Sequence, residues 1–120
     1  SLALSTPASA NPIQVKMVCG AHSADPAKLK AFQVSFPLDF SNGVLNGTRE
    51  LNNDGKEVFN GIVAYSGDVL LIGNGSRPTG GAWNYEFHGR ARAADGSATL
   101  KGSLKNTSGA VGGRPCTISW

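Results

Sequence analysis

The 120-residue chain has room for one domain, and its 16 glycines with only 16% charged residues favour a turn-rich β protein over a disordered chain. Its net charge of +3 is the excess of 11 Lys and Arg residues over 8 Asp and Glu residues. The basic residues are scattered along the sequence, so we expect no nucleic-acid partner. No stretch of the sequence reaches the ~18 uninterrupted apolar residues that a membrane-spanning helix needs, so no transmembrane segment is expected.

The first residues have a composition typical of an export signal. Ala8-Ser9-Ala10 fits the small-x-small pattern that precedes signal-peptide cleavage. We interpret residues 1–12 as a signal-peptide remnant or an N-terminal tail, and residues 13–120 as a single domain. The expected location of the protein is periplasmic or secreted.

Alternation of apolar and polar residues with a period of two predicts strands along most of the chain. Residues 13–19 alternate, and residues 32–40 alternate over a longer run that has one core side and one solvent side. Between them, an Asp-Pro pair followed by good helix formers predicts one short helix over residues 25–31. Asn42-Gly43 then predicts a hairpin turn.

Six further strands are predicted at regular spacing, separated by Gly-rich turns. They cover residues 44–51, 56–65, 68–75, 82–92, 97–106 and 114–120. About eight strands with short connections favour an all-β antiparallel meander that closes into a small up-and-down, lipocalin-like barrel. Such a barrel is filled by side chains or holds one small ligand. An open or sandwiched sheet is the alternative.

The two cysteines, Cys19 and Cys116, fall on the first and the last predicted strand. Two cysteines in an exported protein usually form a disulfide, and this one requires the first and last strands to be neighbours, as they are in a closed barrel. Two buried free thiols are the alternative. No metal site is expected, because no histidine or third cysteine lies at ligand spacing.

The predicted strand that contains Val69–Ile72 is apolar on both faces. A strand of this kind is usually covered on both sides. The short helix, the N-terminal tail or a second subunit would supply the cover. The last of these is a homodimer formed through the Val69–Ile72 strand.

Aromatic residues share one face of the strand that begins near residue 82. They are Trp83, Tyr85 and Phe87. The simplest interpretation is that they belong to the core. The functional interpretation is that Trp83 and Tyr85 line the mouth of the barrel and stack on a sugar or another flat ligand.

The polar faces of this strand and the next carry a set of basic residues. A four-residue turn over 93–96 places Phe87 opposite Gly102, so that a large side chain faces a small one. The same register gathers His88, Arg90, Arg92, Lys101 and Lys105 on the other face. We interpret this face either as an anion-binding patch or as an ordinary solvated surface.

No motif of a serine hydrolase, a zinc protease or a nucleotide-binding loop occurs in the sequence. The eight acidic residues are dispersed, so no pair of carboxylates suited to a glycosidase is visible. We therefore expect a protein that is not an enzyme and has no cofactor.

Glycine, aromatic and cysteine residues recur at particular spacings along residues 13–120. They include the Trp83-x-Tyr-x-Phe-x-Gly89 run, Asp95-Gly96, Leu100-x-Gly102 and Arg114-Pro115-Cys116-Thr117. This layout resembles that of small exported β-rich proteins of alphaproteobacteria. The resemblance implies a bacterial periplasmic location and brings no activity or functional residues with it.

Three functions fit these patterns. The first is a non-enzymatic exported domain that binds a protein or glycan of the cell envelope through the barrel mouth or the basic face. The second is a carrier of a small hydrophobic ligand in the barrel interior. The third is an inhibitor of a secreted hydrolase, because a disulfide-closed β domain presents its loops rigidly.

Overall fold

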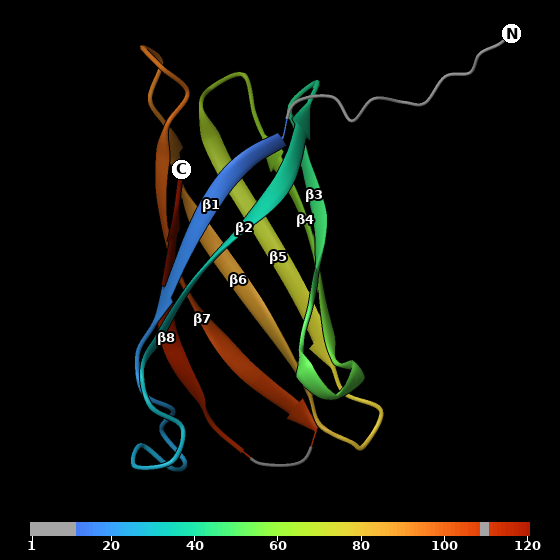
Figure 1. Ribbon diagram of the computed structural model, residues 1–120. Helices are drawn as coiled ribbons and strands as arrows, with labels where there is room; N and C mark the ends of the chain where they lie inside the picture. Colours follow the sequence, from blue (N-terminus) through green and yellow to red (C-terminus); the bar gives the residue numbers. More distant parts are fainter. Residues whose placement is uncertain (1–11, 109–110) are drawn as a thin grey trace, which may run out of the picture.

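The chain folds into a closed antiparallel barrel of eight strands that pair in sequence order (Figure 1). The structure, a computed structural model, describes residues 12–108 and 111–120. The strands are β1 (Pro12–Cys19), β2 (Phe32–Ser41), β3 (Val44–Glu50), β4 (Lys56–Val63), β5 (Asp68–Ser76), β6 (Ala82–Ala91), β7 (Ala98–Ser108) and β8 (Gly113–Ser119). The predicted all-β meander and its closure are confirmed, and the open or sandwiched sheet is excluded.

The barrel closes where β1 pairs with β8. In this pairing Cys19 lies directly opposite Cys116, and the two residues form a disulfide with their Cα atoms 4.1 Å apart. The bridge joins residues 97 positions apart in the sequence. The predicted disulfide between the first and last strands is therefore confirmed, and the alternative of two free thiols is wrong.

The register between β6 and β7 is the one predicted from the four-residue turn. Phe87 pairs with Gly102, and Gly89 pairs with Leu100. A Cβ atom at Gly102 would lie 1.8 Å from the carbonyl oxygen of Glu86, and one at Gly89 would lie 2.6 Å from Leu100 Cδ2. Glycine is thus required at both positions, because no larger residue fits between the two strands.

The predicted helix over residues 25–31 is wrong. The segment contains a single turn, in which the Leu29 amide donates to the Asp25 carbonyl at 2.8 Å and the Asp25 side chain accepts from the Lys28 amide at 3.2 Å. A segment this short does not sustain a helix by propensity alone. The only helical element in the described chain is the 3-10 turn η1 (Asn52–Asp54).

The predicted N-terminal tail, residues 1–12, lies almost entirely outside the described residues. Strand β1 begins at Pro12, one residue before the predicted start of the domain. Within the described ranges no helix is long and apolar enough to cross a lipid bilayer.

The two ends of the barrel differ in their connections (Figure 1). The upper end in this view has the tight turns at 42–43, 64–67 and 92–97, together with the described ends of β1 and β8. The interior nearest this end is filled by apolar side chains that are almost completely buried. They include Val15, Leu38, Leu45, Val69, Leu71, Phe87, Leu100 and Ile118.

The lower end has the connections between β1 and β2, β3 and β4, β5 and β6, and β7 and β8. The β1–β2 loop is fastened to β8, because the Gly20 amide donates to the Pro115 carbonyl and the Ser23 amide donates to the Gly113 carbonyl, both at 2.8 Å. The lower mouth is thus bordered on one side by a loop whose backbone is held in place.

Strand β5 is apolar on both faces, and the structure places one face inside the barrel and the other outside. Val69 and Leu71 point into the barrel, whereas Leu70 and Ile72 lie outside with 40% and 41% exposure. On the outer surface Leu70 pairs with Ile62 of β4, which is also exposed. Self-association through this strand stays a prediction, and sedimentation of the protein over a range of concentrations would test it.

Candidate functional site

A pocket of about 480 Å³ opens at the lower end of the barrel. This volume lies within the range of ligand-binding pockets in proteins, ~300–1,000 Å³. Its apolar walls are formed by Leu29, Phe32, Val34, Leu51, Trp83 and Leu104. Its polar lining consists of Arg49, Glu57, Arg77, Tyr85, Asn106 and Arg114, with His22 at the rim.

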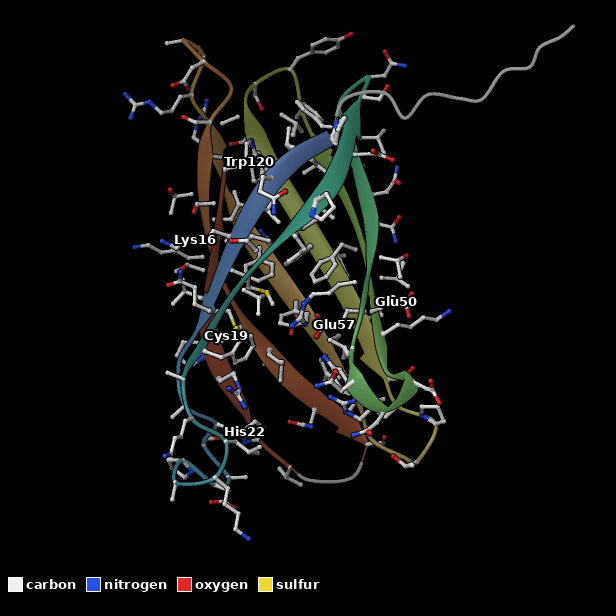
Figure 2. All side chains as sticks on the ribbon, viewed as in Figure 1. Lys16, Cys19, His22, Glu50, Glu57 and Trp120 are labelled. Atoms are coloured by element: carbon white, nitrogen blue, oxygen red, sulfur yellow. A yellow bond between two sulfur atoms is a disulfide. The ribbon has the colours of Figure 1, made fainter. Side chains whose placement is uncertain are left out.

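The polar centre of the pocket is the carboxylate of Glu57, which is only 2% exposed and lies inside the barrel (Figure 2). Arg49 Nη1 donates to its Oε1 atom at 2.8 Å. Its Oε2 atom accepts from Trp83 Nε1 at 2.8 Å and from the Tyr85 hydroxyl at 2.5 Å. Three donors and one opposite charge compensate the cost of burying this carboxylate.

Strand geometry brings these side chains together. Glu57 shares the inner face of β4 with Phe59, and it pairs with Gly75 on the adjacent strand β5. Gly75 in turn pairs with Trp83 of β6. A Cβ atom at Gly75 would lie 2.2 Å from Trp83 Cε2, so the missing side chain is what lets the indole lie over β5 and reach Glu57.

Tyr85 forms part of the pocket floor. Burial, together with the negative charge of Glu57, raises the pKa of the Tyr85 phenol far above its ordinary value. The phenol therefore stays protonated and acts as a hydrogen-bond donor. Its ring belongs to a row of aromatic rings, with centroids 5.1 Å apart for Phe36–Phe59, 5.5 Å for Phe59–Tyr85 and 5.8 Å for Tyr85–Phe87.

Arg114, on β8, is a further charged group of the inner wall. Its Nη1 atom donates to the carbonyls of Gly20 at 3.3 Å and Lys30 at 3.0 Å, at the two ends of the β1–β2 loop. Its guanidinium lies over the Phe32 ring, 5.1 Å from the centroid. The Nε atom is buried and has no hydrogen-bond partner. Burial lowers the pKa of this guanidinium below its ordinary value.

Arg77, in the β5–β6 connection, lies over the ring of Trp83. Its guanidinium carbon lies 5.9 Å from the centroid of the Trp83 ring, within cation–π range. Its Nη1 atom also donates to the carbonyl of Asn52. Arg77 thus ties the β3–β4 connection to the wall of the pocket.

His22, near the lower rim in Figure 2, is buried. Its Nδ1 atom accepts from the Ala24 amide at 3.1 Å, so this nitrogen carries no proton. Its Nε2 atom then donates to Asn106 Oδ1 at 2.5 Å. The histidine therefore anchors the β1–β2 loop to β7 and adds no charge to the pocket.

The candidate site residues from the sequence are divided between two places. Trp83 and Tyr85 line the pocket, although both donate to Glu57 and Tyr85 is fully buried. The basic candidates lie on the outer surface of the barrel, outside this pocket: His88, Arg90, Arg92 and Lys101. The structure therefore does not bring the aromatic and basic candidates into one site.

Two of the outer basic residues already have carboxylate partners. His88 Nε2 lies 2.7 Å from Glu86 Oε2, and Arg90 Nη1 lies 3.1 Å from Asp68 Oδ1. All four of these side chains are largely exposed, so each pair contributes little to stability. The outer face is a mixed-charge surface more than a concentrated basic patch.

The sequence interpretation missed Arg49, Glu57 and Arg114. The alternation of the strands contains the signal, because residues an even number of positions apart point to the same face. Arg49, Glu57 and Arg114 therefore share the inward face with the buried residues Leu45, Phe59 and Cys116 respectively. A charged residue at an inward position of a barrel strand indicates a polar interior site. Arg77 gave no such signal, because it lies in a connection that has no alternating pattern.

No cluster of three or more His, Cys, Asp or Glu side chains suited to a metal ion occurs among residues 12–108 and 111–120. A scan against protein-family models finds no match, and neither the curated proteins nor the solved structures give one. The case for a function therefore depends on the geometry of the pocket.

Proposed function

We propose that this protein is a non-enzymatic binding domain that holds a small ligand in the lower mouth of its barrel. The observation that carries the proposal is the pocket of about 480 Å³, which combines apolar walls with a few fixed polar groups. Sites for small molecules typically have this composition, in which the apolar walls provide affinity and the polar groups fix orientation.

The ligand would occupy the lower part of the barrel only. The aromatic row from Phe36 to Phe87 crosses the interior, and apolar side chains fill the space above it. Among the functions predicted from the sequence, these observations favour a carrier of a small, largely apolar molecule. They favour it in a modified form, since the ligand rests in the mouth and does not run the length of the barrel.

The arrangement of Glu57 supports binding over catalysis. Its carboxylate accepts three hydrogen bonds from the protein, so most of its acceptor sites already have protein donors. Tyr85 donates to the same carboxylate and is equally occupied. These groups hold the shape of the pocket and leave the recognition of a ligand to its remaining surface.

An exported location remains part of the proposal. A disulfide that joins the first and last strands supports it, because such bonds persist in oxidising compartments. Recognition of an envelope protein or glycan, or inhibition of a secreted hydrolase, would use the loops around the same mouth. A binding assay with a small probe separates these alternatives, since only the carrier needs the pocket itself.

The test uses phenylnaphthylamine, an uncharged dye that becomes fluorescent in apolar surroundings. We expect saturable binding to the purified protein and loss of binding in the variant Leu51→Trp, because the larger ring fills the pocket that Leu51 lines. Leu70→Trp is the matched control, since Leu70 lies on the outer surface. If the dye does not bind, or if Leu51→Trp binds it as well as the unmodified protein does, the proposal is wrong.

A further inference from the structure

The pocket contains more positive than negative charge. Three arginines line it, Arg49, Arg77 and Arg114, against the single carboxylate of Glu57. His22 adds no charge, because its Nδ1 atom is a hydrogen-bond acceptor. The lining therefore has an excess of two positive charges beside its apolar walls.

The negative charge of Glu57 is satisfied by its own neighbours. Arg49 lies 2.8 Å from one oxygen, and Trp83 and Tyr85 donate to the other. In the part of the chain that the structure describes, the ion pairs are Arg49–Glu57, His88–Glu86 and Arg90–Asp68. Arg77 and Arg114 belong to none of them.

Arg114 has the geometry of a guanidinium prepared for an anion. Its Nη1 atom is fixed by the carbonyls of Gly20 and Lys30, and its face rests on the Phe32 ring. These contacts set the orientation of the group before any ligand arrives. Its buried Nε atom is left without a protein acceptor, although such a donor is costly to leave unpaired.

An arginine that is partly desolvated, oriented and without a counter-charge is stabilised by an oxyanion, because its planar group of donors matches carboxylate, sulfonate or phosphate oxygens. Part of the lining of the same pocket is apolar. Phe32, Val34, Leu51 and Leu104 line the same pocket and offer no polar partner to the rest of a ligand. A ligand that satisfies both requirements is amphipathic.

We propose that the barrel mouth selects a small amphipathic organic anion, whose oxyacid group lies against Arg114 and whose apolar part contacts Phe32, Val34 and Leu51. The inference rests on the proposed function, because it names the class of ligand that the same pocket binds. Arg77, at the rim, adds to the positive potential that attracts such an anion. Figure 2 shows Glu57, which lines the same pocket, inside the barrel.

The experiment compares two dyes that share a carbon skeleton. Anilinonaphthalene sulfonate carries a sulfonate group, and phenylnaphthylamine carries none. The measured quantity is the ratio of their Kd values in the unmodified protein and in Arg114→Gln. We expect the preference for the sulfonate to fall by about tenfold in the variant, the effect of one charge-assisted hydrogen bond. Binding of the uncharged dye reports whether the pocket of the variant is intact.

Two controls keep the result specific to the pocket. Lys16→Gln removes one positive charge from an exposed position on the outer face of β1, and we expect the ratio to stay unchanged. Ile62→Ser removes the most exposed of the apolar side chains beside β5. It controls for adsorption of the sulfonated dye to this outer apolar surface. We expect sulfonate binding to survive this change.

A measurement on the unmodified protein does not depend on the folding of any variant. Between about 0.01 and 1 M NaCl the Debye length falls from about 30 to 3 Å, so binding of the sulfonate should weaken while binding of the uncharged dye should not. Decanoate should displace the sulfonated dye, whereas inorganic phosphate at the same concentration should not. Displacement by phosphate alone would show that the apolar part of the ligand is not required and would overturn that half of the proposal.

The outcomes separate the two proposals. If the uncharged dye does not bind, the proposed function fails. If the uncharged dye binds in the pocket but the sulfonate has no salt-dependent preference, or keeps its preference in Arg114→Gln, then the inference about the anion is wrong while the binding function stands. If Arg114→Gln loses both dyes, the variant Arg114→Lys is measured instead, because it keeps the positive charge. A ratio of the two Kd values equal to that of the unmodified protein at every salt concentration would then exclude a role for the guanidinium group.

Discussion

The two ends of the barrel are built by the same strands from the same alternation, yet they differ in what the inward positions carry. Towards the upper end the inward residues are apolar and almost fully buried, as at Leu45, Leu71 and Ile118. Towards the lower end the same strands place Arg49 and Arg114 inside. The comparison teaches that folding and binding are separated along the barrel axis, although β3 and β8 contribute side chains to both ends.

The filled end is stabilised by burial of apolar surface, which is the dominant favourable contribution to folding. The open end instead depends on hydrogen bonds to buried charges, which are costly if any partner is missing. Changes at the two ends are therefore expected to have different consequences. Changes at the filled end should alter stability alone, and changes at the open end should alter stability and ligand binding in separable ways.

The largest expected effect comes from removing the bond that holds the two ends in one closed sheet. In the variant Cys19→Ser/Cys116→Ser, unfolding should require up to about 4.7 kcal/mol less, the chain-entropy value for a loop of about 100 residues. Urea denaturation followed by tryptophan fluorescence and by circular dichroism measures this loss. Coincident transitions from the two probes would show that both ends unfold together, and an unchanged midpoint would contradict the prediction.

A further large effect is expected at the centre of the open end. Glu57→Gln leaves Arg49 without its counter-charge and should lower the free energy of unfolding by about 3 kcal/mol, the lower limit for breaking a buried ion pair. The lower limit applies because the Arg49 side chain keeps 20% exposure. Glu50→Gln, at an exposed position nearby, is the matched control and should change stability by less than about 0.5 kcal/mol.

A pair of leucine-to-alanine variants compares the two ends directly. Leu71→Ala creates a cavity in the filled end, where Leu71 is completely buried, and should cost about 2–5 kcal/mol. Leu51→Ala widens a pocket that is already open, so we expect a cost of only about 1 kcal/mol. Equal losses in a denaturation experiment would show that the lower end is as tightly packed as the upper end.

The smallest effect is expected in alkaline solution. In a Tyr65→Phe variant Tyr85 is the sole tyrosine. Because the pKa of Tyr85 is raised in the folded state, its contribution is complete below about pH 10, and stability falls by about 1.4 kcal/mol per pH unit above that value. Phenolate absorbance should thus rise only together with the loss of the β-sheet circular dichroism signal. Ionisation of Tyr85 while the sheet is intact would contradict its burial beside Glu57.

Much of the fold was predictable from the sequence because strand alternation is a local signal. The eight strands, the turn at Asn42-Gly43 and the pairing of Phe87 with Gly102 all follow from residue type and spacing. Closure was predictable only through the cysteines, which carry information about two distant segments. The predicted helix over residues 25–31 failed because contacts of the loop with β8 outweigh a weak local preference.

The candidate site was predictable only in part. Trp83 and Tyr85 attract attention as aromatic residues, but their hydrogen bonds with Glu57 depend on three adjacent strands and on the missing side chain of Gly75. The outward basic residues attracted the same attention because charge alone does not reveal which face is enclosed. A basic residue reaches the interior only if it lies an even number of positions from a buried residue on its strand. Arg114, two residues before the buried Cys116, is the clearest example.

Antiparallel pairing of β1 with β8 has a practical consequence for experiments. The described chain starts at Pro12 and finishes at Trp120, and both positions lie at the upper end of the barrel, opposite the pocket (Figure 1). A tag or surface linker attached at Trp120 would therefore point away from the mouth. Immobilised in that orientation, the protein would present its open end to solution, which makes it a convenient scaffold for a sensor of small anions.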